Sequence, residues 1–75
     1  MKNKYQLTAI IEREGDMYVA LCPELDIASQ GGSVEEARKN LQEALELFFE
    51  DASETEVHER LHTEVFVTHM EVAVG

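Results

Sequence analysis

Hydrophobic and polar residues alternate over the first third of the chain in the pattern of two neighbouring strands. The alternation predicts a first strand over Lys4–Arg13, one face of which carries Tyr5, Leu7, Ala9 and Ile11. Glu14-Gly15-Asp16 follows as a short polar hairpin loop. A second strand is predicted over Met17–Cys22, and it ends because Pro23 lacks a backbone donor and favours extended geometry before it.

The middle of the chain changes from this strand pattern to a helical one. A short third strand is predicted over Ile27–Gln30, and Gly31-Gly32 then allow a sharp turn. Ser33 to Glu36 form a capping box, which favours a helix start at Val34. The helix is predicted to run to about Asp51, because apolar residues recur at helical spacing at Val34, Ala37, Leu41, Ala44, Leu45, Phe48 and Ala52.

The C-terminal third is predicted to end in a strand. Residues 52–63 are polar and indicate a loop with a short helical turn. Residues 63–74 alternate again, with Phe66, Met70, Val72 and Val74 on one face and Val65 and Val67 on the other. A helix between two strands is the crossover that brings the last strand beside an earlier one. The predicted fold is therefore α+β, one domain over residues 1–75 in the order β-β-β-α-β, with one helix on one face of a small, mostly antiparallel sheet.

Charge limits the classes of partner. Sixteen acidic residues face six basic ones, for a net charge of −10, so direct binding to nucleic acid or to an anionic membrane is not expected. A basic protein is the partner that such a charge would attract, although acidity also serves solubility alone. The sequence contains no stretch of about 20 apolar residues that could span a membrane. The single Cys22 rules out an internal disulfide and favours the cytoplasm.

The strands carry more apolar residues than one helix can cover. If the face with Tyr5 and Leu7 lies under the helix, then Ile10, Ala20 and one side of residues 63–74 face outward. We therefore expect a homo-oligomer, a dimer or a tetramer, in which a sheet face is buried. Scattered apolar residues on the surface are the alternative interpretation.

Acidic residues concentrate at the end of the predicted helix. No Lys or Arg occurs between Asn40 and Glu59, whereas seven acids do. Acids in the last helical turn oppose the helix dipole, so this placement suggests that they serve another purpose. We expect a contact with a basic partner here, against the alternative of a solvated acidic face. The predicted contact residues are Glu46, Leu47, Glu50, Asp51 and Glu54.

Candidate catalytic or metal-binding groups are few. His58 and His62 have the four-residue spacing of metal ligands on a helix, but surface histidines in a polar segment are the commoner interpretation. Cys22 could act as a nucleophile beside a histidine, yet its position before Pro23 is more typical of a small buried residue. The sequence therefore predicts no enzyme, no cofactor and no metal site.

The segment from Tyr5 to about Glu50 resembles the HicB-like antitoxins. The resemblance is carried by Tyr5, the hairpin at Gly15, Tyr18-Val19-Ala20, Cys22-Pro23-Glu24-Leu25, Gln30-Gly31, Ser33-Val34-Glu35-Glu36-Ala37, Leu41 and Ala44. It implies a partial ribonuclease-H-like fold without catalytic carboxylates. It also implies a homo-oligomer that neutralises a small basic messenger-RNA-cleaving toxin of the HicA type. Many members add a C-terminal DNA-binding segment, and this chain, which ends at Gly75, is expected to be a short form without one.

Three functional hypotheses follow from these observations. The first is an antitoxin-like protein of a type II toxin–antitoxin system that covers a basic ribonuclease toxin. The second is a stand-alone homo-oligomeric module without a cognate toxin. The third is a metal-dependent nuclease remnant that uses His58, His62 and nearby acids.

Overall fold

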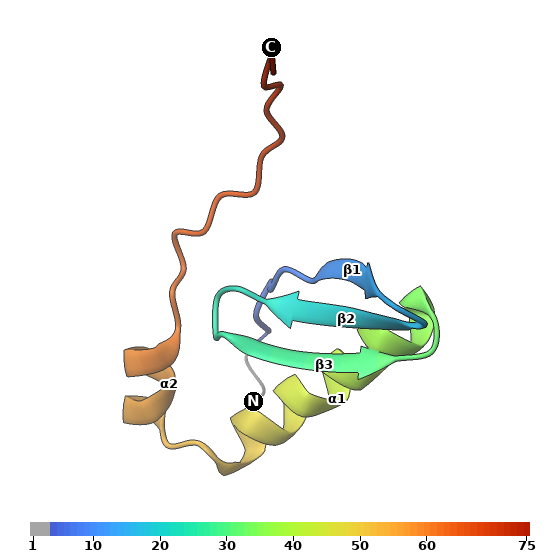
Figure 1. Ribbon diagram of the computed structural model, residues 1–75. Helices are drawn as coiled ribbons and strands as arrows, with labels where there is room; N and C mark the ends of the chain where they lie inside the picture. Colours follow the sequence, from blue (N-terminus) through green and yellow to red (C-terminus); the bar gives the residue numbers. More distant parts are fainter. Residues whose placement is uncertain (1–3) are drawn as a thin grey trace.

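The computed structural model describes residues 4–75, which form a small sheet with a long helix packed on one face (Figure 1). The strands are β1 (Ile10–Glu14), β2 (Met17–Cys22) and β3 (Ile27–Gly31), and the helices are α1 (Val34–Asp51) and α2 (Glu54–Arg60). The described strands are antiparallel neighbours in the order β1-β2-β3. The structure confirms the predicted α+β class. It also confirms the order β-β-β-α and the placement of the helix on one face of the sheet.

The strand register decides which side chains form the core. Ala20 of β2 lies directly opposite Ile11 of β1 and Ser29 of β3, so these three side chains share the face that α1 covers. The buried core consists of Ala20, Cys22, Leu25, Ala37 and Leu41. The prediction that Ile10 faces outward is confirmed, because its side chain is 39% exposed. The same prediction for Ala20 is wrong, because its position across from Ile11 places it beneath the helix.

The connection from β3 to α1 brings strand and helix into close contact. A Cβ atom on Gly31 would lie 2.6 Å from the backbone nitrogen of Ala37, so only glycine fits here without a shift of the backbone. The Ser33 hydroxyl accepts a hydrogen bond from the Glu36 N–H, and the Glu36 carboxylate accepts one from the Gly32 N–H. This capping box fixes the start of α1 at the predicted residue.

The first strand is shorter than its alternation predicts. β1 begins at Ile10 instead of Lys4, because Ile10 pairs with Leu21 and β2 ends one residue later, before Pro23. Residues 4–9 therefore extend past the end of their neighbour. Within the described part of the chain they belong to no strand.

The predicted final strand is not formed. The polar segment after α1 contains the expected helical turn as α2, but residues 63–74 have no strand assignment within the described chain. They run away from the sheet as a single extended segment (Figure 1). The alternating pattern predicts a strand, and this prediction is wrong for the described chain, because a strand also requires a neighbour with which to pair. Neither helix in residues 4–75 is long and apolar enough to cross a membrane.

Candidate interaction surface

A broad groove lies between the N-terminal segment, α1 and α2. Residues 4–9 form one wall, and one side of α1 together with α2 forms the other. The apolar residues that line it are Tyr5, Leu7, Ala9, Leu41, Leu45, Phe49, Ala52, Val57 and Leu61. Lys4, Arg38, Glu46, Glu50 and Glu54 add charges to the same lining. An open apolar floor with charged edges suits a polypeptide better than a small molecule, which needs an enclosed pocket.

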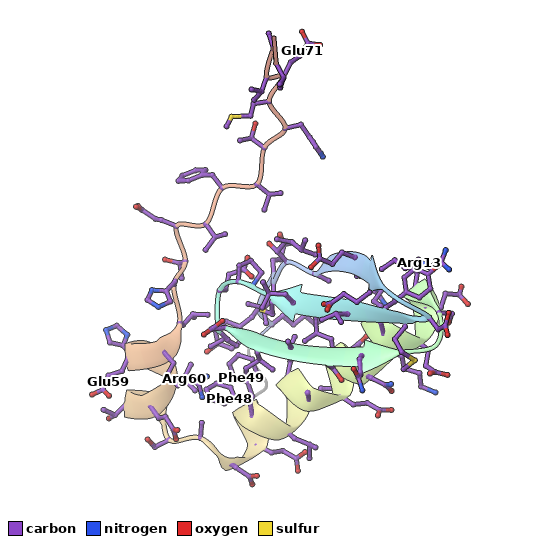
Figure 2. The ribbon with its side chains drawn as sticks, in the orientation of Figure 1. Arg13, Phe48, Phe49, Glu59, Arg60 and Glu71 are labelled. Carbon is purple, nitrogen blue, oxygen red and sulfur yellow. The ribbon has the colours of Figure 1, made fainter. Side chains whose placement is uncertain are left out.

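Aromatic contacts hold the walls of this groove in place. The rings of Tyr5 and Phe49 are stacked, with centroids 4.7 Å apart, so the N-terminal segment is fixed to the C-terminal half of α1. Phe48 packs edge-on against Phe49 at 5.3 Å, and the Arg60 guanidinium lies 4.9 Å from the centroid of the Phe48 ring. Figure 2 shows Arg60 reaching from α2 toward the two phenylalanines of α1.

The turn between β2 and β3 carries a buried carboxylate. Glu24 is only 7% exposed, and its two oxygens accept hydrogen bonds from the Thr8 N–H at 3.0 Å and the Thr8 hydroxyl at 2.5 Å. The Cys22 thiol donates a further, longer bond at 3.4 Å. Burial raises the pKa of Glu24, but the hydrogen bonds from Thr8 outweigh it, so the pKa lies below its ordinary value. The carboxylate is thus a structural link between residues 4–9 and the β2–β3 turn.

The backbone of the same turn anchors α2 and the residues after it. The Arg60 guanidinium donates a hydrogen bond to the carbonyl of Leu25 at 3.0 Å. The His62 N–H donates one to the carbonyl of Glu24 at 2.8 Å. The start of the C-terminal segment is therefore fixed beside the point at which Thr8 binds Glu24.

The five predicted partner-binding residues are all exposed, but they lie on two surfaces. Three of them, Glu46, Glu50 and Glu54, line the groove. Leu47 and Asp51 instead line a smaller hollow between α1 and α2, together with Phe48 and Glu56. The Leu47 side chain is 59% exposed, which confirms its predicted place off the buried stripe of the helix.

The candidate chemical groups are not gathered into one site. His58 lies on α2 and His62 follows its end, and both are exposed. Among residues 4–75 no group of three or more histidine, cysteine or acidic side chains is placed to hold a metal ion. Cys22 is fully buried, and this burial raises the pKa of its thiol, which disfavours the nucleophilic thiolate.

Sequence reasoning did not identify Glu24 or Arg60 as important. Both act through contacts with residues distant in the chain, 16 positions away for Glu24 with Thr8 and 35 for Arg60 with Leu25. The one local signal for Glu24 is an acidic residue placed between the apolar residues Pro23 and Leu25.

Comparison with known proteins places the chain in a family. No family model and no solved structure matches it. The UPF0150 protein ssl0738 of Synechocystis sp. is 45% identical over 53 residues. The alignment covers 68% of this chain and 74% of that protein, so the similarity extends over most of both sequences. The chain therefore belongs to the UPF0150 family.

Proposed function

We propose that this protein is a HicB-like antitoxin that binds and neutralises a small basic ribonuclease toxin of the HicA type. The observation that carries the proposal is the acidic surface at the end of α1 and on α2. Seven acids occur between Asn40 and Glu59 without a Lys or Arg, and an exposed leucine, Leu47, lies among them. The resemblance of residues 5–50 to the HicB-like antitoxins supports the same function.

The energetics of α1 favour a basic partner. Glu50 and Asp51 lie in the last turn of the helix, which contains no basic residue. Each exposed acid at this negative end costs about 0.3–1 kcal/mol, and the repulsion between Glu46 and Glu50, one turn apart, adds a few tenths. Cations of a partner would remove this repulsion on binding. The same field would steer a basic protein toward this end of the molecule and make its association sensitive to salt.

The shape of the surface supports a two-part contact. The hollow around Leu47 and Phe48 offers apolar area, and Asp51 and Glu56 on its edge offer charge. An apolar centre with a charged rim is the usual arrangement of a protein interface. A toxin whose active surface binds RNA must itself be basic, so the contact that neutralises its charge would also cover its active surface.

A second candidate function is a stand-alone homo-oligomeric module without a toxin. It is favoured by the sheet face that α1 does not cover, where Ile10 is 39% and Met17 is 38% exposed. Exposed apolar residues on adjacent strands are typical of a face that binds another polypeptide.

The first proposal is tested with the product of the neighbouring gene. We expect a small basic protein that arrests growth alone, forms a complex with this chain on co-expression, and loses its toxicity in that complex. A neighbour that forms no complex and whose growth arrest is not relieved would contradict the antitoxin function and leave the module as the better description.

Charge-reversing variants locate the contact. Glu50→Lys with Asp51→Lys should weaken binding of the basic protein at least about tenfold, mainly through a slower association rate. The control is Glu14→Lys with Asp16→Lys in the exposed β1–β2 hairpin, which makes the same change in net charge far from α2. Equal loss of affinity in both variants would indicate an effect of net charge alone.

A further inference from the structure

The C-terminal arm, defined as residues 63–74, is an extended, largely apolar segment that pairs with no strand of the described chain. Phe66, Met70, Val72 and Val74 share one side of it and are 86%, 81%, 70% and 90% exposed. Figure 2 shows Glu71 near the far tip of the arm, well away from the sheet. The arm lengthens the molecule to 52 Å by 28 Å by 17 Å, with a radius of gyration of 14.6 Å. A compact chain of this length would have about 11 Å.

The body of the molecule has an open sheet edge at β1, where a further strand could pair. β1 is one of the two edge strands of the described sheet, β3 being the other, and residues 4–9 continue β1 with backbone groups that no strand of residues 4–75 pairs. Beside this edge lies the groove, whose floor includes Leu41, Leu45 and Phe49 of α1. A further strand beside β1 would pair with the backbone of residues 4–9 and lie across this floor.

The side-chain pattern of the arm fits that position. Because successive side chains of a strand alternate between faces, Phe66, Met70 and Val72 would all point toward α1. The arm carries only two of the sixteen acids, Glu64 and Glu71, and is the least charged stretch after α1. The charged side chains of the groove lining are two basic ones, Lys4 and Arg38, and three acidic ones, Glu46, Glu50 and Glu54. An arm with few acids therefore adds little repulsion in this groove.

The arm is unsuited to folding back onto its own groove. Its base is fixed by the hydrogen bond from the His62 N–H to the Glu24 carbonyl, and from there it leaves the body. Residues 61–74 contain no Gly, Pro, Asn or Asp, the residues that make tight reversals possible. We therefore expect another molecule to fill the groove.

We propose that two copies of this chain exchange their C-terminal arms. The arm of each copy adds as a fourth strand beside residues 4–9 and β1 of the other, with Phe66 and Met70 on the floor formed by Leu41, Leu45 and Phe49. The exchange buries the apolar side of both arms and satisfies the backbone groups of both edges. It uses the apolar floor of the groove, whereas the proposed toxin contact uses the hollow around Leu47 and Asp51 and the acids Glu46, Glu50 and Glu54 in the groove lining. Dimerisation and toxin binding are measured separately, so each can fail without the other.

The test is the oligomeric state of the full chain and of two matched variants. Sedimentation equilibrium of the purified protein should show a dimer at micromolar concentration. Phe66→Asp with Met70→Asp places two charges on the side of the arm that faces the groove, and it should raise the dimer dissociation constant at least about 100-fold. Val67→Asp with Ala73→Asp adds the same charge to the other side of the same arm and should leave it within about threefold.

Hydrogen exchange of the wild-type dimer locates the pairing. Amides of the arm and of residues 4–9 should both be protected in the dimer, and both should lose protection in the Phe66→Asp, Met70→Asp variant. Because the arm packs on no core residue of its own chain, far-UV circular dichroism of that variant should retain the signal of α1.

A wild-type monomer with a protected arm would mean that the arm docks in its own chain. A dimer unaffected by Phe66→Asp with Met70→Asp would mean association through the uncovered sheet face. Either result overturns the exchange.

Discussion

Glu24→Gln is expected to destabilise the fold far more than an isosteric change normally does. The glutamine keeps the shape of the side chain but replaces one acceptor oxygen with an NH₂ donor and removes the charge. In the structure both carboxylate oxygens accept hydrogen bonds from Thr8, one from its N–H and one from its hydroxyl. The Thr8 hydroxyl can turn to accept from this NH₂, so both contacts can persist, but as neutral hydrogen bonds in place of charge-assisted ones.

The magnitude follows from these two bonds. A hydrogen bond to a charged group contributes about 1.5–3 kcal/mol and a neutral one about 0.5–1.5 kcal/mol, so each bond is weakened by about 1 kcal/mol or somewhat more. Thr8 is half-buried and water offsets part of the loss, so we expect the free energy of unfolding to fall by about 1–2 kcal/mol at neutral pH. A chain of 75 residues has a total stability of about 4–11 kcal/mol, so the change is a large fraction of it.

The pH dependence gives a second, independent measure. In the folded protein the pKa of Glu24 lies below its ordinary value of 4.5, which it regains on unfolding. A carboxylate with a lowered folded pKa contributes its full stability above the unfolded pKa and loses it as the pH falls through the folded pKa. The difference between wild type and Glu24→Gln should therefore be constant from pH 7 to about 5.5 and shrink below pH 4.5.

Urea denaturation followed by circular dichroism measures both effects. The control is Glu43→Gln, which makes the same chemical change at an exposed position of α1. It should alter the free energy of unfolding by less than about 0.5 kcal/mol. If Glu24→Gln is equally mild, or if its effect does not decrease in acid, Glu24 does not hold residues 4–9 to the β2–β3 turn.

Two further predictions concern close packing and the buried thiol. Gly31→Ala should lower the free energy of unfolding by about 1–3 kcal/mol, because its Cβ would lie 2.6 Å from the Ala37 nitrogen. Gly32→Ala, with its nearest atom at 3.6 Å, is the matched control in the same urea titration, and equal effects would refute the close contact. The Cys22 thiol, fully buried and with a raised pKa, should react with a thiol reagent at neutral pH far more slowly in the native protein than in urea. Equal reaction rates in the native protein and in urea would show that the end of β2 at Cys22 opens freely.

Elements with strong local signals could be predicted closely. The predicted bounds of β2, Met17–Cys22, are those of the structure, and α1 begins at the predicted Val34 and ends at Asp51, near the predicted end. Pro23 ends β2 because it lacks an N–H, and the capping box at Ser33 begins α1. Leu47 was also predicted to be exposed, because a helical period separates the buried stripe of α1 from the rest of its surface.

Features that depend on a second segment could not be predicted. The face on which Ala20 lies follows from its register with Ile11, and β2 is apolar on both faces, so its own sequence does not choose between them. Likewise the role of Glu24 depends on Thr8, which only the fold brings close.

The sequence by itself determined where the backbone is extended and where it is helical, because φ/ψ preferences, caps and turns act over a few residues. Tertiary structure alone decided which extended segments become strands. Residues 4–9 and 63–74 both alternate like strands, yet neither is paired within the described chain. Residues 4–9 have no partner because β2 ends at Cys22, and residues 63–74 have none because they leave the body of the molecule after His62. A strand forms only when its backbone is hydrogen-bonded to a neighbouring strand, and the hydrophobic period of one segment does not specify that neighbour.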